Sequence, residues 1–149
     1  MSAWQAVEGV PGLWCRARVT GGVPMWNSFA VRLVDDSLAV ISAPPSPGAG
    51  ELAELEALGQ PTVLLAPNHF HNLGLRGFSE RFPGAVAVST PLARPRLLAK
   101  SGVATGGLEA LAERLPAGVS VVVPPGTKQG ECWLRFDTPS GVAWLVTDA

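Results

Sequence analysis

Hydrophobic and polar residues alternate in the first part of the chain, which is the pattern of β-strands whose two faces meet different surroundings. In residues 13–19 the apolar side chains occupy every second position, so we expect a strand with Arg16 and Arg18 facing water. Residues 27–44 follow as two strands joined at Asp35-Asp36-Ser37, which predicts a hairpin. Its second arm, "LAVIS", is almost entirely apolar and therefore predicts a central strand.

The middle of the chain changes to a helical period between short apolar runs. Leu52, Leu55 and Leu58 fall on one stripe before Gly59, which predicts a helix that ends at the glycine. Further helices are expected at 73–82, 91–100 (broken by a proline) and 107–115, and strands at 62–66, 85–89, 119–124, 131–138 and 142–148. This order predicts one domain, residues 1–149, in which helices cover a mixed sheet and the last strands begin a second sheet.

Composition narrows the class of protein. Hydrophobic residues make up 47% of the 149 residues, enough for a large core, and the formal net charge of -1 gives no electrostatic case for nucleic acid or a membrane surface. The N-terminal residues lack the pattern of a signal peptide, and no apolar run reaches the ~18 residues of a membrane helix. Cys15 and Cys132 lie far apart and fit a reducing cytosol, so we expect a cytoplasmic protein, although a disulfide stays possible.

Both histidines of the chain fall in the segment "APNHFHNLGL", residues 66–75, which follows the predicted strand 62–66. His69 and His71 are two residues apart, and in an extended turn two such imidazoles can face one metal ion. In the alternative interpretation both rings hydrogen-bond loop carbonyls, and Asn68 and Asn72 are turn or cap residues.

This part of the chain resembles the metal-binding loop of the metallo-β-lactamase superfamily, which usually reads H-x-H-x-D-H. The resemblance lies in the order of a strand, the run "NHFHNLG", a helix and the strand "AVAVSTP". Residues 26–44 are similar to the opening hairpin of that family, and residues 124–149 to a later segment in which Asp148 stands where the bridging aspartate would be. The resemblance implies an α/β (α+β) fold, a metallo-β-lactamase-like αββα sandwich with a partial second half.

The sequence departs from the family pattern at most of the metal ligands. Leu73 stands where the loop aspartate should be, and Gly74 where the last histidine of the loop should be. Ser42 replaces the aspartate of the early turn, and Thr127 falls at the expected third histidine. Leucine and glycine cannot coordinate an ion, so a two-metal centre is not expected.

Two functions follow from this resemblance. The favoured one is a non-catalytic or weakly metal-binding member of the fold that acts as a binding or interaction module, with its small-molecule ligand unidentified. The alternative is a hydrolase with a single ion, zinc or another borderline divalent metal, bound by His69, His71 and Asp148. Its general base is not identified by the sequence, and Glu80 and Glu131 are the candidates considered.

Other catalytic patterns are absent from the sequence: there is no G-x-S-x-G elbow, phosphate-binding loop or C-x-x-C pair. A pairing of a cysteine with a histidine stays open, although both cysteines fall in predicted strands. In the family's usual plan the second sheet continues beyond residue 149, which would leave strand 142–148 as an edge. We therefore expect self-association, a homodimer formed through the terminal strands.

Overall fold

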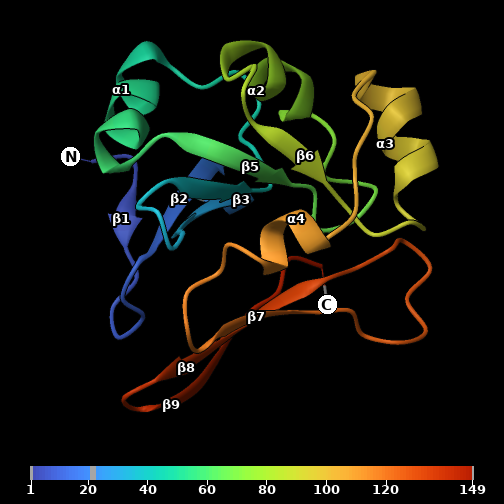
Figure 1. Cartoon of the computed structure of the whole chain (residues 1–149). Helices are drawn as coiled ribbons and strands as arrows, with labels where there is room; N and C mark the ends of the chain where they lie inside the picture. The colour runs from blue at the N-terminus through green and yellow to red at the C-terminus, as the bar shows by residue number, and fades with distance from the viewer. Residues whose placement is uncertain (1, 21–22, 149) are drawn as a thin grey trace.

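The computed structural model describes residues 2–20 and 23–148, which form two sheets and a layer of helices (Figure 1). The first sheet has the order β1-β2-β3-β4-β5-β6 and the second the order β7-β8-β9. The strands are β1 Gln5–Ala6, β2 Leu13–Thr20, β3 Val23–Arg32, β4 Leu38–Ile41, β5 Pro61–Leu65, β6 Val86–Val88, β7 Val119–Val122, β8 Trp133–Thr138 and β9 Gly141–Leu145. The helices are α1 Ala49–Leu58, α2 Leu75–Arg81, α3 Arg94–Ser101 and α4 Glu109–Ala112.

The first sheet is mixed, as predicted. Strands β1 to β4 pair antiparallel, whereas β4, β5 and β6 pair parallel. Each parallel pair needs a crossover, which α1 supplies between β4 and β5 and α2 supplies between β5 and β6. The predicted hairpin at residues 35–37 is confirmed, since Arg32 pairs with Leu38 and the Asp35 carboxylate accepts a hydrogen bond from the Ser37 N–H at 3.0 Å.

The core has two parts, one on each side of the first sheet. Successive residues of the central strands alternate between them: Val40 packs toward α1–α3, and Ile41 toward the second sheet and α4. Because both faces of β4 and β5 are covered, these strands read as continuous apolar runs. The layers are therefore helices, first sheet and second sheet, with the helices α1 to α3 above the first sheet in Figure 1.

The prediction that Arg16 faces water is wrong. Its residue is 8% exposed, and its guanidinium pairs with the carboxylate of Glu51 in α1. The alternation in β2 suggested one wet face, but α1 packs over that part of the sheet, so the arginine is buried with an acidic partner. The Arg18 side chain and the Gly21-Gly22 turn lie outside the described residues.

The ends of the strands bring three segments together. The loop after β5, the segment before β8 and the segment after β9 lie at one end of the two sheets. Cys132 donates its N–H to the carbonyl of Pro67 at 2.9 Å, and His69 donates its N–H to the carbonyl of Gln129 at 3.0 Å. Within residues 2–20 and 23–148, no helix is long and apolar enough to cross a membrane.

Candidate functional site

The loop after β5, residues 66–74, carries the two histidines to the carboxyl end of the parallel strands. Ser42, directly after β4, donates its N–H to the carbonyl of Leu65 at 3.0 Å, so it lies beside this loop. The Asn72 amide donates to the carbonyls of His69 and Phe70, each at 3.2 Å, and thereby closes the turn. In open α/β sheets this end of the strands is the usual place for a binding site.

Asn68 is the centre of a buried polar cluster. Its side chain is completely inaccessible to solvent, and its amide nitrogen donates to Glu131 Oε2 at 2.8 Å and to Asp148 Oδ2 at 2.7 Å. Its amide oxygen accepts the N–H of Phe70 at 2.8 Å. A single amide thus joins the β5 loop to the segments that flank β8 and β9.

Glu131 is a buried carboxylate that is surrounded by donors. It is 1% exposed, and its Oε1 accepts a hydrogen bond from the Thr147 hydroxyl at 3.0 Å. Its own N–H donates to the Thr127 hydroxyl at 3.2 Å. Because an unpaired buried charge is costly, the hydrogen bonds that the carboxylate accepts from Asn68 and Thr147 are what make Glu131 tolerable at this position.

His71 lies between a serine and an aspartate. Its Nε2 is 2.7 Å from Asp148 Oδ2, and its Nδ1 is 2.6 Å from the Ser42 hydroxyl. Ser42 is fully buried and has a φ of 58°, an unusual backbone for a residue with a side chain. Partial burial raises the pKa of Asp148, but the hydrogen bonds from Asn68 and His71 outweigh it, and the net pKa is lowered.

His69 has different surroundings. Its ring packs edge-on against Phe70 with the ring centroids 4.3 Å apart, and the Arg96 guanidinium lies 5.2 Å from the Phe70 centroid. Burial first, and then the positive charge of Arg96, lower the pKa of His69. The imidazole of His69 is therefore held in its neutral form near pH 7.

The predicted metal ligands are only partly brought together. His71 and Asp148 are in contact, whereas the contacts of the His69 ring are with Phe70. Among residues 2–20 and 23–148 no group of three or more His, Cys, Asp and Glu side chains is placed to hold a metal ion. A catalytic zinc takes three protein ligands, and this arrangement does not present them. Metal binding by His69, His71 and Asp148 stays a prediction.

The positions that depart from the family pattern have structural reasons. Leu73 is 65% exposed at the surface of the loop. Gly74 has its backbone against the end of β4, and a Cβ built on it would lie 2.0 Å from the Ala43 carbonyl oxygen. No side chain fits at residue 74 unless the backbone moves, so a histidine ligand at this position is sterically excluded in this conformation.

The other residues considered for catalysis fall in different places. Glu80 lies on the exposed side of α2, where it pairs with Arg76 at 3.1 Å, so it is not part of the cluster. Both cysteines are free thiols, and burial, followed by the charge of Glu131, raises the pKa of Cys132 to about 12. A thiol with that pKa is not a nucleophile near neutral pH.

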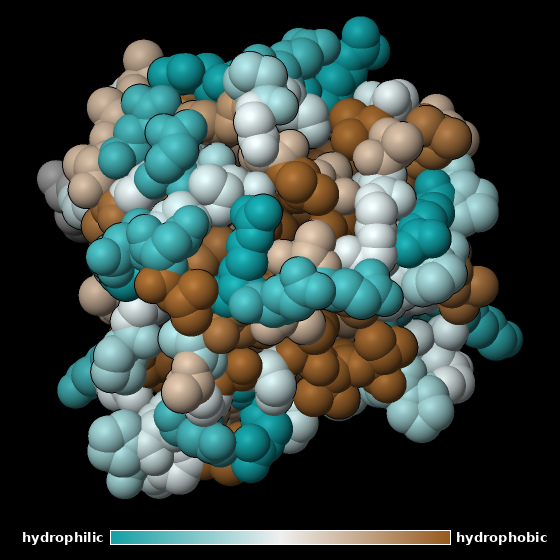
Figure 2. Space-filling model, viewed as in Figure 1, coloured by the Kyte–Doolittle hydropathy of each residue, from teal (hydrophilic) through white to brown (hydrophobic). Residues whose placement is uncertain are grey.

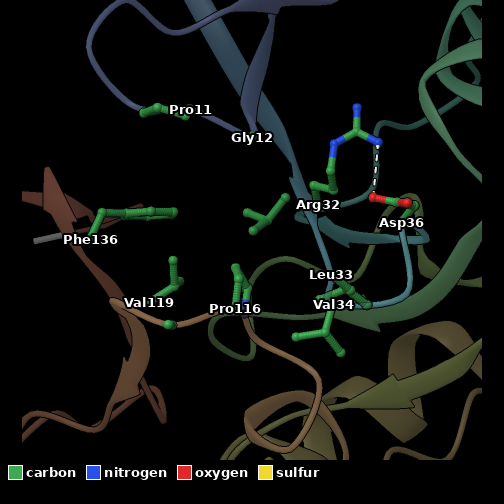
Figure 3. Close-up of a pocket in the computed structure, with 11 residues that line it drawn as sticks. Pro11, Gly12, Arg32, Leu33, Val34, Asp36, Pro116, Val119 and Phe136 are labelled. Carbon is green, nitrogen blue, oxygen red and sulfur yellow. Dashed lines mark ion pairs between the residues drawn. The ribbon is translucent and has the colours of Figure 1, made fainter.

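A groove of about 560 Å³ opens at the other end of the strands, between β3 and the second sheet (Figure 3). Pro116, Val119 and Phe136 line it, and its charged residues, Arg32 and Asp36, pair with each other at 3.8 Å. None of the predicted site residues lines this groove. The cluster around Asn68 therefore remains the candidate site.

The sequence indicated His71 and Asp148 but missed Asn68 and Glu131 as members of the site. Asn68 was considered only as a turn residue, and Glu131 only as a possible base. The available indication was the position of each polar residue next to a buried strand: Asn68 follows "VLLAP", and Glu131 precedes "CWLRF".

Comparison with known proteins identifies the fold. No protein-family model matches the sequence, and no curated protein is similar to it in sequence. Several solved structures are similar in fold. The hydrolase AbOPH of the beta lactamase superfamily has a TM-score of 0.61 and 13% identity over 99% of this chain and 74% of its own. A putative metallo-beta-lactamase from Thermotoga maritima has a TM-score of 0.56 and 16% identity over 92% of this chain and 79% of its own.

A third similar structure is a longer chain, of which this protein matches less than half. The flavodiiron protein from Giardia intestinalis has a TM-score of 0.55 and 17% identity over 90% of this chain but only 37% of its own. At these identities the likeness establishes the fold alone. The chain has the metallo-β-lactamase fold that the resemblance implied.

Proposed function

We propose that this chain, which has the metallo-β-lactamase fold, is a non-catalytic binding or interaction module in which a hydrogen-bonded polar cluster takes the place of a metal centre. The cluster consists of Ser42, Asn68, His71, Glu131 and Asp148. The observation that carries the proposal is the Asn68 amide, which donates to both carboxylates of the cluster, at 2.8 and 2.7 Å.

The chemistry of the donors supports a structural role for this cluster. A metal ion binds carboxylate oxygens through their free lone pairs, whereas Asp148 Oδ2 already faces both the Asn68 amide and His71 Nε2. An ion bound to Oδ2 would have to displace at least one of these partners. The amide nitrogen of Asn68 is a hydrogen-bond donor and not a ligand, so the buried centre of the cluster carries a group that cannot coordinate.

The cluster also ties three segments to one another. Asn68 belongs to the β5 loop, Glu131 to the segment before β8, and Thr147 and Asp148 to the segment after β9. Hydrogen bonds to buried charged groups are worth about 1.5–3 kcal/mol each, so the cluster holds the two sheets together at this end. A rigid loop surface there, with Phe70 52% and Leu73 65% exposed, is suited to contact a ligand or partner.

The metal content of protein purified without chelator tests this proposal. We expect less than about 0.2 zinc, manganese or iron per chain, with no gain after incubation with zinc and gel filtration. Asp148→Asn, which retains the size of the side chain but weakens any metal site, should leave the content unchanged. One metal per chain that falls to background in Asp148→Asn would overturn the proposal.

A second candidate is the single-metal hydrolase that uses His69, His71 and Asp148. The contact between His71 Nε2 and Asp148 Oδ2, at 2.7 Å, favours it because it brings two of the three proposed ligands together. One structural neighbour is described as a hydrolase. In this case His69→Ala and His71→Ala should each abolish metal binding, and normal binding by either variant would make that histidine structural.

The cytoplasmic location inferred from the sequence is part of this proposal. Cys15 and Cys132 are both free thiols, which supports a reducing compartment. Fractionation of cells that express the tagged chain at native level tests it, and recovery outside the cytosolic fraction would contradict it.

A further inference from the structure

The outer face of the second sheet carries exposed hydrophobic side chains. In the register of β8 and β9, Leu134 pairs with Leu145 and Phe136 with Ala143, and the large members of these pairs are buried against the first sheet. The residues between them point to the other face, where Val142 is 49% exposed and Trp144 is 50% exposed.

This outer face is an aromatic surface as well as an apolar one. Trp133 of β8 and Trp144 of β9 lie edge to face with their ring centroids 6.1 Å apart. Figure 2 shows a hydrophobic patch below the polar residues that cross the middle of the view, to the right of the β8–β9 hairpin. Within the described residues the helices α1 to α3 cover the first sheet, and none of them lies over the outer face of β8 and β9.

Strand β9 is the open edge of this sheet. It pairs with β8 on one side, and in Figure 1 the β8–β9 hairpin projects from the body of the molecule. The other edges of the described sheets are short or have neighbours: β1 has two residues, β6 is bridged by Gly106, and β7 lies beside α4. On the free side of β9 the unpaired N–H and C=O groups can pair with another strand.

The residues of β9 favour a second copy of the same strand as the occupant. Gly141–Leu145 contains no charged residue and no proline, so two copies of it meet without like-charge repulsion and without a missing donor. The nearest charges, Arg135 and Asp137 of β8, neutralise each other at 2.8 Å. An acidic or basic partner would find no complementary charge at this edge, whereas an identical neutral strand fits it.

We propose that two copies of this chain associate through β9, antiparallel and about a two-fold axis at Ala143. In this register Val142 of each copy lies opposite Trp144 of the other, so the exposed hydrophobic side chains form two aromatic–aliphatic cross-strand pairs. The small Ala143 side chains meet at the axis. The two sheets become one continuous sheet of six strands, and all five residues of β9 are paired.

Sedimentation velocity at micromolar concentration tests the association. The wild-type chain should sediment at twice the chain mass of 15.5 kDa. Val142→Lys removes the aliphatic member of both cross-strand pairs and places two like charges at diagonal positions of the joined sheet, so it should give the single-chain mass. The matched control is Leu98→Lys, which replaces a side chain that is 51% exposed on α3 and should remain dimeric. Circular dichroism and thermal unfolding establish that both variants are folded.

A cross-link tests the register independently of affinity. In Ala143→Cys the two introduced thiols lie opposite each other at the axis, and diamide should give a disulfide-linked dimer on a non-reducing gel. In Ser140→Cys, a position in the turn before β9, the thiols lie about 20 Å apart in the same register and should not be linked.

Three results would overturn the proposal. The first is a wild-type chain that sediments at the single-chain mass at 100 micromolar, roughly a hundredfold above a micromolar Kd. The second is a dimer that Val142→Lys leaves intact. The third is equal cross-linking of Ala143→Cys and Ser140→Cys.

Discussion

Replacement of Asn68 by alanine should cost more stability than any ordinary polar substitution in this chain. The change removes the donor to Glu131 and Asp148 and the acceptor for the N–H of Phe70. Hydrogen bonds to charged groups contribute about 1.5–3 kcal/mol each, and a neutral one about 1 kcal/mol. Because Asp148 is partly exposed, we place its bond at the low end, and the expected loss is about 4–5.5 kcal/mol.

Urea unfolding followed by tryptophan fluorescence measures this loss. With a slope of roughly 2 kcal/mol per molar urea, the midpoint should fall by about 2–2.8 M. The matched control is Asn72→Ala, the same substitution four residues along the same loop. The Asn72 amide donates only to the backbone carbonyls of His69 and Phe70, and its loss should cost less than about 1 kcal/mol.

A second variant separates the loss of a donor from the creation of a cavity. Asn68→Asp retains the shape of the side chain but turns a carboxylate oxygen toward Glu131 and Asp148. Like charges then oppose one another in a buried site, so this variant should be less stable at pH 7 than at pH 5. Equal losses of free energy in Asn68→Ala and Asn72→Ala, or an Asn68→Asp variant as stable as the wild type at pH 7, would show that Asn68 does not hold the two carboxylates in place.

Three further predictions concern the same end of the molecule. Gly74→Ala should unfold the β5 loop or the whole chain, because its Cβ would lie 2.0 Å from the Ala43 carbonyl oxygen; a thermal midpoint close to the wild type would contradict this. Because the pKa of Asp148 is lowered in the folded chain, its carboxylate stabilises the fold above the unfolded-state pKa of about 4, and this stabilisation is lost as the pH falls through the folded-state pKa. Asp148→Asn should therefore make the free energy of unfolding depend less on pH below about 4. Because the pKa of His69 is lowered in the folded chain, protonation of its ring below about pH 6.5 opposes folding. Arg96→Gln should raise that pKa, as measured from the imidazole NMR shifts at a series of pH values. An unchanged titration curve would show that the charge of Arg96 does not lower the pKa of His69.

The sequence predicted the fold best where the local pattern and the tertiary surroundings agree. The turn at residues 35–37 and the apolar runs of β4 and β5 needed no knowledge of distant residues, because strands covered on both faces are apolar throughout. Arg16 was mispredicted because its partner Glu51 lies 35 residues away on a helix. Alternation distinguishes two faces, but it does not tell which face another element will cover.

The residues of the candidate site were likewise predicted only in part from the sequence. His71 was found because the chain has only two histidines, two residues apart, and Asp148 was found because it stands where the resemblance places a bridging aspartate. Asn68 and Glu131 were not recognised as partners, because their roles arise from contact across 63 residues between a loop and a segment that no local pattern connects. The choice between the two histidines also needed the structure, which puts His71 against Asp148 and leaves the His69 ring against Phe70.

If the cluster around Asn68 stabilises the fold without a metal, the free energy of unfolding does not depend on zinc. Urea unfolding is compared in chelator and in free zinc, for the wild type and for His71→Ala. An ion bound only to the folded chain would add about 2.7 kcal/mol when its concentration is 100 times its Kd. We expect the same midpoint with and without zinc, and a zinc-induced stabilisation that His71→Ala abolishes would contradict a metal-free cluster.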